Sequence, residues 1–482
     1  MGNFFSPSSS PKDPHKIAVT EERKRKRTED DQDRSYLGLL NTPKRKRIKS
    51  TSKYIYQTLF LEGENSDVTI RALDRDWKLH KLYLKQSPYF ASMFNGSWKE
   101  SDLETIQIDI IDENISEDAL KIAFGSLYKD DVFLKPVQIV SVLAAATLFQ
   151  LESLIQQCSI MMKETMSSCA VCVYYSASQE YGLEDMRVKC LNWLTRNILT
   201  TENITFIKEI GTKLMAEIIS CPQLFVMQVE IDIYTLLKKW IYLCYNPDWS
   251  GETKDLLKDA DAFFKKEMTG KHVCYLETEE GKKYFEVFTA IRWHHVVNDI
   301  SSIKMLENDR ILPIGCLDPM FLYGWRRVLS VEQGHDKGPE RNVEESVFND
   351  CCIRCGRVLL KEDDYCWRWV GYNYGVDLLV IISNRIVTLK RNTHTETCSQ
   401  AVSLQDMRYL CYRMTISSVD KDGNETFRKG TGIRKIGLGK NEDEIVLMLD
   451  KNQEYPLAVS MNLLFLSPSP ECPLPRLKMP DG

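Results

Sequence analysis

The sequence predicts a multidomain protein of the α+β class, because three residue patterns follow one another along its 482 residues. A short alternating strand begins near Ser66 and helical segments follow it, a long run with helical periodicity extends from Ser168 to Ile303, and a pattern of period two occupies Cys351 to about Ser467. A chain of this length is too long for a single hydrophobic core, so two or three domains are expected. An α/β module, an all-helical module and a β-rich, sandwich-like module are predicted in this order.

Composition narrows the class of protein further. The chain is 43% hydrophobic and 10% aromatic, which is typical of a globular protein with attached disordered parts. It has no run of eighteen uncharged apolar residues and begins without a signal peptide, so neither a transmembrane segment nor secretion is expected. The 15 cysteines are spread along the chain, which favours reduced core thiols over a disulfide framework.

Residues 1–53 form a basic tail that we expect to be disordered, because they contain few large apolar residues. They hold 14 Lys and Arg against 7 Asp and Glu, a net charge of +7, so the remaining residues carry −12 of the overall −5. A basic tail on an acidic body indicates an address or an electrostatic contact, and direct nucleic-acid binding is not expected. Two clusters predict nuclear localisation, with a solvated charge run as the alternative: Arg23, Lys24, Arg25, Lys26 and Arg27, then Lys44, Arg45, Lys46 and Arg47.

The first six residues, Met1 to Ser6, match the loose pattern for N-myristoylation, which makes Gly2 a candidate acylation site. Pro7 follows the serine and disfavours the transferase. A single acyl chain binds membranes only marginally, and the basic clusters could supply a second signal.

An α/β module is predicted for residues 54–167. Ser116 is expected to cap a helix that begins after it, Val132–Leu134 is a strand candidate, and Val137–Leu148 should be a deeply buried helix. In order, the module contains Asp67-Val68-x-Ile70, His80-Lys81-x-x-Leu84, Ser87-x-Tyr89-Phe90-x-x-Met93-Phe94 and an Ala-rich helix ending in Cys, which comprises Val140–Ala146 and Leu151–Cys158. This order resembles the BTB/POZ fold, a dimerisation and adaptor module.

Residues 168–310 are predicted to be all helical. The clearest helix is Val229–Ile241, whose Ile233, Leu237, Trp240 and Ile241 share one apolar stripe while Lys238 and Lys239 lie off it. A helical run directly after a BTB module resembles the BACK domain of ubiquitin-ligase adaptors. Residues 311–350 are predicted to be a linker, because the stretch 330–349 is polar and contains two glycines and a proline.

Residues 351–467 are expected to form a β-rich domain, and residues 468–482 a Pro-rich tail. The predicted turn is Asp420–Asn424. The strands are predicted at Asp377–Ser383, Arg385–Lys390, Tyr409–Ile416, Glu444–Leu449 and Val459–Leu466.

Several motifs outside the BTB module sharpen the assignment. They are Leu40–Arg47, Ser50–Leu61, Arg354-Cys355-Gly356-Arg357 and Tyr365-Cys366-Trp367-Arg368-Trp369. Together with the order of domains, they resemble the germ cell-less family over roughly residues 40–467. The resemblance implies a cullin-3 ubiquitin ligase, the nucleus with its envelope or matrix, and a developmental role in germ-cell differentiation or spermatogenesis.

Two sets of residues are assigned by the resemblance to BTB adaptors. Trp98, Lys99 and Glu100 resemble the hydrophobic-x-Glu motif presented to cullin-3, with a Trp that packs on its own domain as the alternative. Asp67 and Lys81 match a charged pair near the homodimer interface, with a simple intradomain ion pair as the alternative.

Neither a metal site nor a catalytic site is predicted. Cys352-x-x-Cys355 has the spacing of a zinc knuckle, but no second pair answers it among Cys351, Cys366, His394 and Cys398. The chain offers no Ser/His/Asp set, and the cysteine spacing does not fit a RING finger.

The sequence therefore predicts a non-catalytic adaptor without a cofactor, which dimerises through its BTB module, binds cullin-3 and recruits unknown protein substrates. The alternative is a structural or transcriptional co-regulator at the nuclear envelope that uses the BTB module only to dimerise.

Overall fold

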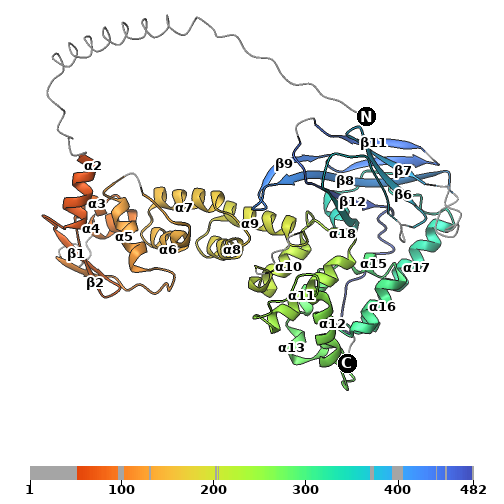
Figure 1. Cartoon of the computed structure of the whole chain (residues 1–482), viewed down its shortest axis with the longest axis horizontal. Coiled ribbons are helices and arrows are strands. Elements are labelled where there is room, and N and C mark those ends of the chain that lie inside the picture. The colour runs from red at the N-terminus through yellow and green to blue at the C-terminus, as the bar shows by residue number, and fades with distance from the viewer. Residues whose placement is uncertain are drawn as a thin grey trace, which may run out of the picture. The chain divides into compact units, whose positions relative to one another are not determined.

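The computed structural model describes residues 51–95, 103–129, 132–200, 204, 206–369, 374–392, 405–440, 442–450 and 453–479 (Figure 1). It divides into two compact units. The first comprises residues up to Ile110 together with Phe124–Val132, and the second comprises Ile111–Ala123 and the chain from Phe133 onward. Helices and sheets occur together, so the predicted α+β multidomain class is confirmed.

The first unit contains a three-stranded sheet of strand order β2-β1-β3. Strands β1 (Val68–Ala72) and β2 (Arg75–Leu79) are antiparallel and are joined by Leu73 and Asp74, both with positive φ, as a tight hairpin requires. Strand β3 (Thr105–Gln107) lies parallel to β1. The helical elements are α2 (Thr51–Tyr54), the π-helical η2 (Ile55–Leu61), α3 (Lys81–Leu84), α4 (Pro88–Asn95) and the end of α5 (Glu117–Ser126).

Aromatic side chains form the core of the first unit. The rings of Trp77 and Phe124 meet edge to face with 5.5 Å between centroids, and Phe90 packs beside Phe124. Tyr56 and Phe60 approach Gly125 so closely that an added Cβ would lie 3.1 Å from each ring. The strand and helix periodicities of this stretch therefore bury their apolar residues in one cluster.

The second unit begins at Ile111, shortly before α5. The hydroxyl of Ser116 accepts a hydrogen bond from the amide of Ala119 at 3.2 Å, which confirms the predicted N-cap. The predicted strand at Val132–Leu134 is wrong, because no β-ladder in the described residues includes it; Phe133 is 80% exposed, and a 3-10 turn starts at Pro136.

Helices follow almost without interruption up to Cys351. The predicted buried helix is confirmed as α6, in which Ile139 and Val142–Ala146 are buried. The elements are η4 (Pro136–Gln138), α6 (Ile139–Leu148), α7 (Glu152–Glu164), α8 (Val171–Glu180), α9 (Glu184–Asn197), η5 (Phe206–Glu209), α10 (Thr212–Ser220), α11 (Ile231–Tyr245), α12 (Leu256–Glu267), η6 (Tyr275–Glu277), α13 (Glu279–Lys282), α14 (Phe285–Thr289), α15 (Trp293–Val296), α16 (Ile300–Asp309), η7 (Ile314–Leu317), α17 (Asp318–Glu332) and α18 (Glu345–Cys351).

Helix α11 confirms the predicted apolar stripe, and Lys238, which lies off that stripe, is nevertheless buried. That side chain is only 2% exposed and forms ion pairs with Asp261 of α12 and with Asp309 of α16, the latter at 2.5 Å. The two carboxylates come from helices that are distant in sequence. They compensate a charge that the helix pattern alone places toward solvent.

The segment 311–350, predicted as a linker, is largely helical. Helix α17 begins with a proline in its first turn and buries Met320, Arg327 and Val331, while α18 buries Phe348. The glycines and the proline that suggested a linker occupy only the loop between these two helices. The apolar periodicity of α17 was the stronger signal.

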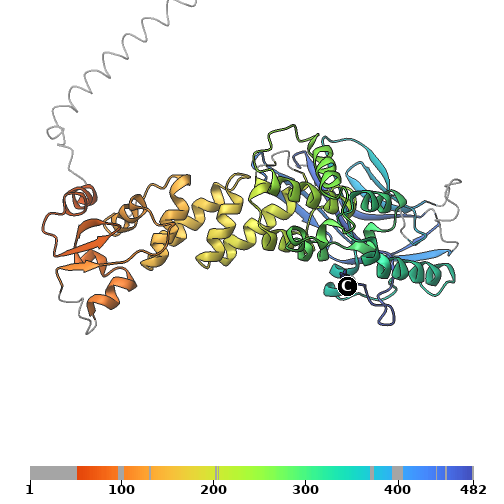
Figure 2. The same cartoon turned by 90° about the horizontal axis from the view of Figure 1, so that it is seen from below.

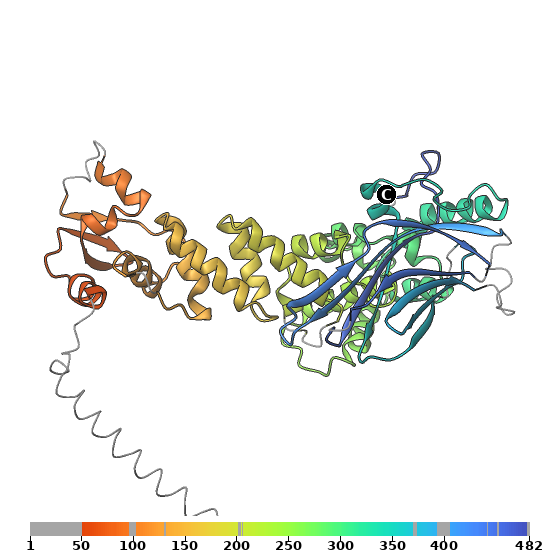
Figure 3. The ribbon, with the colours of Figure 1, turned by 90° about the horizontal axis from the view of Figure 1, so that it is seen from above.

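The C-terminal strands form two sheets that enclose one apolar cluster. The five-stranded sheet has the order β10-β8-β12-β4, with β9 paired to β8, and the four-stranded sheet has the order β11-β7-β6-β5. Figures 2 and 3, taken from opposite sides, show these strands lying on one side of the helices of this unit. The strands are β4 (Ile353–Leu359), β5 (Tyr365–Trp369), β6 (Leu378–Ser383), β7 (Ile386–Arg391), β8 (Met407–Val419), β9 (Glu425–Gly430), β10 (Arg434–Gly439), β11 (Asp443–Met448) and β12 (Leu457–Leu464).

Alternation along β8 and β12 determines the two faces of the five-stranded sheet. Leu410, Met414 and Val459 point into the core between the sheets, while Arg413 and Ser460 lie on the opposite face. That opposite face meets the helices, and it carries the candidate site described below.

Candidate functional site

The two residues predicted for the dimer surface, Asp67 and Lys81, lie together in the first unit. The carboxylate of Asp67 accepts a hydrogen bond from the backbone amide of Lys81 at 2.7 Å, at the start of α3. The Lys81 ammonium lies 5.5 Å from the ring centroid of Phe94. Within one chain, Asp67 therefore orders a helix start, and its part in a dimer remains a prediction.

His80, which belongs to the second BTB motif, joins three segments of the first unit by hydrogen bonds. One ring nitrogen lies 3.1 Å from the hydroxyl of Tyr128 and the other 3.0 Å from the carbonyl of Glu64. The same hydroxyl also accepts a hydrogen bond from the backbone amide of His80 at 3.0 Å. Burial raises the pKa of Tyr128, so its hydroxyl keeps the proton and can both donate and accept.

Several predicted site residues lie outside the described part of the chain. They include Trp98, Lys99 and Glu100, which follow the end of α4 at Asn95. The same holds for Gly2, for both basic clusters of the tail, and for His394 and Cys398.

The cysteines considered for zinc differ in exposure. Cys352 and Cys355 are buried, Cys351 is partly buried and Cys366 is exposed. The Arg292 guanidinium donates to the carbonyl of Cys352 at 2.5 Å and lies 3.2 Å from its sulfur. Among the described residues, no three His, Cys, Asp or Glu side chains are placed to hold a metal ion.

A cavity lies where α9 meets the five-stranded sheet, and we call it the α9 cleft. It has a volume of about 660 Å³. Its walls come from α9 with the following turn, from the segment before α11, and from β4, β8 and β12. The residues that define it are Trp193, Arg196, Asn197, Thr200, Phe225, Met227, Val358, Leu360, Ser417, Val419, Pro456 and Ala458, together with the turn Asp420–Gly423 and Ser167 and Ser168.

The turn between β8 and β9 lies near α9 (Figure 1). Its residues Asp420–Gly423 line one end of the α9 cleft. The indole of Trp193 donates to the carbonyl of Asp422 at 3.0 Å, and the amide of Asn197 donates to the carbonyl of Gly423 at 3.0 Å. Gly423 has a φ of +81°, and a Cβ there would lie 2.9 Å from the Trp193 ring. The predicted turn is thus confirmed, and only glycine fits this contact.

A buried ion pair fixes the opposite side of the junction between helices and sheet. Glu230, fully buried, accepts hydrogen bonds from Arg354 Nε at 2.8 Å and from Arg354 Nη2 at 2.9 Å. Arg354 also donates to the carbonyl of Ile219 at 2.7 Å. Burial alone would raise the pKa of Glu230, but the Arg354 guanidinium holds it below its usual value. The junction is therefore polar and specific, and it is not a simple apolar contact.

The walls of the α9 cleft combine apolar side chains with amide, hydroxyl and guanidinium groups. Phe225 and Val358 offer apolar surface, and Leu360 is 77% exposed beside them. A concave surface of this composition suits an extended peptide segment, whose side chains bury apolar area while its backbone meets polar groups.

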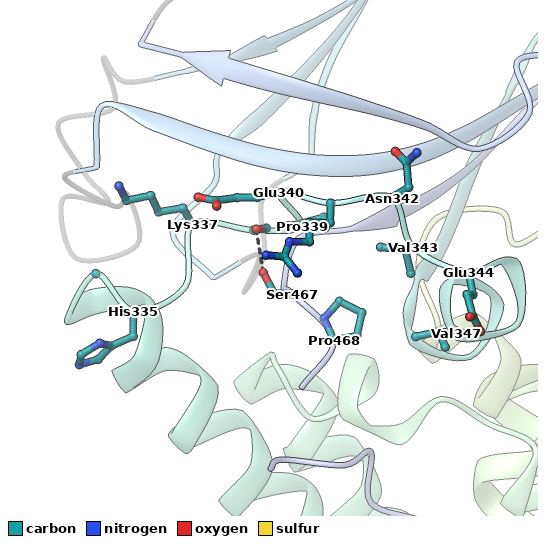
Figure 4. Close-up of a pocket in the computed structure, with 13 residues that line it drawn as sticks. His335, Lys337, Pro339, Glu340, Asn342, Val343, Glu344, Val347, Ser467 and Pro468 are labelled. Carbon is teal, nitrogen blue, oxygen red and sulfur yellow. Dashed lines mark hydrogen bonds between the residues drawn. The ribbon is translucent and has the colours of Figure 1, made fainter. Parts of the chain in front are cut away.

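A second cavity of about 490 Å³ lies under the loop between α17 and α18 (Figure 4). The Ser467 hydroxyl lies 2.7 Å from the carbonyl of Gly338 and 2.9 Å from the carboxylate of the buried Asp336, and its single proton is shared between these two acceptors. The Asp336 carboxylate also accepts a hydrogen bond from Arg327 at 2.6 Å. In the close-up, Lys337 points away from Ser467. These contacts hold the loop on the end of β12, which explains the cavity as part of the fold.

Known proteins resemble this chain both in one domain and over most of its length. The profile of one family, the BTB/POZ domain, matches residues 56–166, so this stretch is a BTB/POZ domain. It is 46% identical over 433 residues to human Germ cell-less protein-like 1, covering 89% of this chain and 84% of that protein. It is 44% identical over 432 residues to human Germ cell-less protein-like 2, covering 89% and 82%. It is 33% identical over 478 residues to Protein germ cell-less of Drosophila melanogaster, covering 92% and 83%.

The chain belongs to the germ cell-less family, as the motifs predicted. A BTB adaptor-type protein is the class that this membership supports, with dimerisation and protein partners suggested by the BTB module. Among the helices that the structure describes, none has the length and apolar composition needed to span a bilayer.

Proposed function

We propose that this protein is a non-catalytic substrate adaptor of a cullin-3 ubiquitin ligase. Its BTB module forms a homodimer and binds cullin-3, and its second unit captures the protein to be ubiquitinated. The supporting observation is that one chain combines a BTB module with a separate cleft whose walls suit a peptide segment. Catalysis is then positional, because the adaptor raises the local concentration of substrate lysines near the conjugating enzyme.

The cullin-binding residues in this proposal are Trp98, Lys99 and Glu100, directly after α4. An aromatic anchor that enters a partner pocket and a carboxylate beside it commonly dominate the binding energy of an interface. The nuclear envelope or matrix is the proposed location, because the tail carries two basic clusters. A role in germ-cell development or spermatogenesis is proposed from the names of the relatives.

The test is co-purification of cullin-3 with the full-length chain. Replacing Trp98 and Glu100 by alanine should weaken cullin-3 binding by roughly 30-fold or more, because each residue is expected to be a binding hot spot. Dimerisation should be unchanged. A matched control removes an exposed tryptophan and glutamate elsewhere, Trp325→Ala with Glu332→Ala in α17, and should bind normally.

Unchanged co-purification of the Trp98→Ala, Glu100→Ala variant would contradict the assignment of these residues. Absence of cullin-3 from the wild-type sample would favour the alternative, a nuclear-envelope structural or transcriptional co-regulator that uses its BTB module only to dimerise.

A further inference from the structure

A small polar cavity opens beside the α9 cleft, and we call it the arginine chamber. It has a volume of about 80 Å³, and its lining includes Arg196, Arg413, Arg428, Thr415, Ser417 and Ser460. Strand register brings the sheet residues to one face, because Ser460 pairs with Thr415 and Arg428 pairs with Ser417. Arg196 reaches the same cavity from α9.

Two of these arginines have a buried nitrogen atom for which the described residues offer no hydrogen-bond acceptor. These atoms are Nη1 of Arg196, which lies 3.2 Å from Glu425 in an ion pair, and Nη2 of Arg413, whose guanidinium also lies 5.5 Å from the ring centroid of Phe348. The Arg413 side chain is 12% exposed and the Arg196 side chain 20%. Burial lowers the pKa of Arg196, so its charge is poorly compensated. An unsatisfied buried guanidinium is costly, and it indicates a missing acceptor.

The charges around the chamber do not balance. Its lining includes three arginines and a single carboxylate, Glu425, which also lies 3.8 Å from Arg428. The other polar side chains of the lining are neutral. Arg413 has one further carboxylate at 3.4 Å, that of Glu345, which is 69% exposed and therefore screened by solvent. Counted over the lining alone, three arginines and one glutamate leave an excess of two positive charges, close in size to the charge of a phosphate monoester at neutral pH.

The arginine chamber and the α9 cleft adjoin each other. Arg196, Phe225 and Ser417 contribute to the walls of both. A ligand that placed an anionic group in the chamber could therefore continue into the larger, more apolar cleft. This continuity favours a modified side chain on a peptide over a free ion, because a free ion would leave the apolar walls unused.

We propose that the arginine chamber binds the phosphate of a phosphorylated serine or threonine in a partner protein, while the residues beside it lie in the α9 cleft. This inference rests on the proposed adaptor function and specifies its substrate class as a phosphorylated segment. No bond is made or broken, and the selection comes from charge-assisted hydrogen bonds to the phosphate oxygens.

A phosphate fits the chamber better than the other occupants. The volume could hold roughly five water molecules, but water would leave the excess charge uncompensated. An aspartate or glutamate side chain brings one negative charge and two acceptor oxygens, whereas a phosphate brings about two charges and three oxygens. Guanidinium groups and hydroxyls around the cavity match the larger number of acceptors.

The test uses the purified full-length chain and peptide arrays with a central phosphoserine or phosphothreonine among varied flanking residues. Matched arrays carry unmodified serine or glutamate at the same place. A subset of phosphopeptides should bind at least about tenfold more strongly than their serine counterparts. Arg413→Gln and Arg196→Gln should each weaken that binding by about tenfold or more, since each removes a charged donor.

Two further variants control for folding. Arg428→Gln changes a side chain that is 46% exposed, so it should fold normally and still weaken binding. Arg434→Gln changes an exposed arginine on β10 that does not line the chamber and should bind as wild type. Melting temperatures of all variants identify any loss that is due to unfolding.

Three results would overturn the inference: no phosphopeptide bound above its serine counterpart, equal binding by the Arg413→Gln and Arg196→Gln variants, or saturable binding of inorganic phosphate without any peptide. Co-purification of cullin-3 with the chamber variants separates this inference from the proposed function. The chamber variants should still co-purify cullin-3. If the wild-type chain binds phosphopeptides but does not co-purify cullin-3, only the proposed adaptor function is contradicted.

Discussion

Replacing Arg354 by methionine should destabilise the second unit by about 3–5 kcal/mol, the usual cost of breaking a buried ion pair from one side. The variant leaves the Glu230 carboxylate, which is 0% exposed, without the two guanidinium hydrogen bonds at 2.8 and 2.9 Å. It also removes the donor for the carbonyls of Ile219 and Cys221, at 2.7 and 3.2 Å. Since neither side chain reaches solvent, the cost is not reduced by screening.

The double variant Glu230→Leu with Arg354→Met separates charge from packing. It removes both charges and should recover at least about 1 kcal/mol of the loss, although the two carbonyls remain unpaired. The pKa of Glu230 is lowered in the folded state. The ion pair therefore contributes its full stabilisation to the folded protein at neutral pH, and this contribution is lost only as the pH falls below the usual glutamate pKa of about 4.3.

Urea denaturation followed by tryptophan fluorescence measures these costs as changes in the free energy of unfolding. The double-mutant cycle gives the coupling between the two residues. A loss below about 1 kcal/mol for Arg354→Met, or strictly additive single and double variants, would refute the reasoning that this pair holds the β-rich domain on the helices.

Gly338→Ala should destabilise by at least about 2 kcal/mol, because φ is +97° and the added Cβ would lie 1.9 Å from the carbonyl of Tyr409. Gly334→Ala is the matched control, since its φ is also positive at +78° but nothing lies within 4 Å, and it should cost only about 1 kcal/mol. Acidification should also destabilise the protein through His294 and His295. Burial lowers the pKa of His295 to about 3 and that of His294 well below its usual value, so both fold as neutral rings. The unfolded chain binds more protons below about pH 6.5, and stability should fall there by up to about 1.4 kcal/mol per pH unit for each histidine.

Thermal melting checks both expectations. Equal losses for the two glycine variants would contradict the close approach at Gly338. For the histidines, the His294→Gln, His295→Gln double variant should lose less stability than the wild type between pH 6.5 and pH 5. An identical pH dependence for both proteins would show that other groups account for it.

The patterns that predicted the fold correctly were local. The ordered motif from Asp67 to Cys158 and the period-two strands after Cys351 depend on neighbouring residues, and the family comparison and the strands at Leu378–Ser383 and Met407–Val419 confirm them. The turn at Asp420–Asn424 was likewise evident from its aspartates and glycine.

The features that the sequence does not indicate arise where distant residues decide the structure. Lys238 lies off the apolar stripe of its helix, and it is buried because carboxylates from two other helices reach it. The linker prediction for 311–350 gave loop residues more weight than the apolar spacing of α17. The α9 cleft and the arginine chamber could not be found from the sequence, because their walls come from segments as far apart as Trp193 and Ala458. Three arginines that are scattered along the chain give no local signal.

In the proposed assembly, two chains pair through their BTB modules and carry cullin-3 together. This assembly is tested by the mass of the full-length protein mixed with the N-terminal fragment of cullin-3, measured by light scattering during size-exclusion chromatography. The measured mass should be that of a complex of two 55.8 kDa chains with one fragment bound to each. A peak with the mass of a single chain, free of cullin-3, would contradict it.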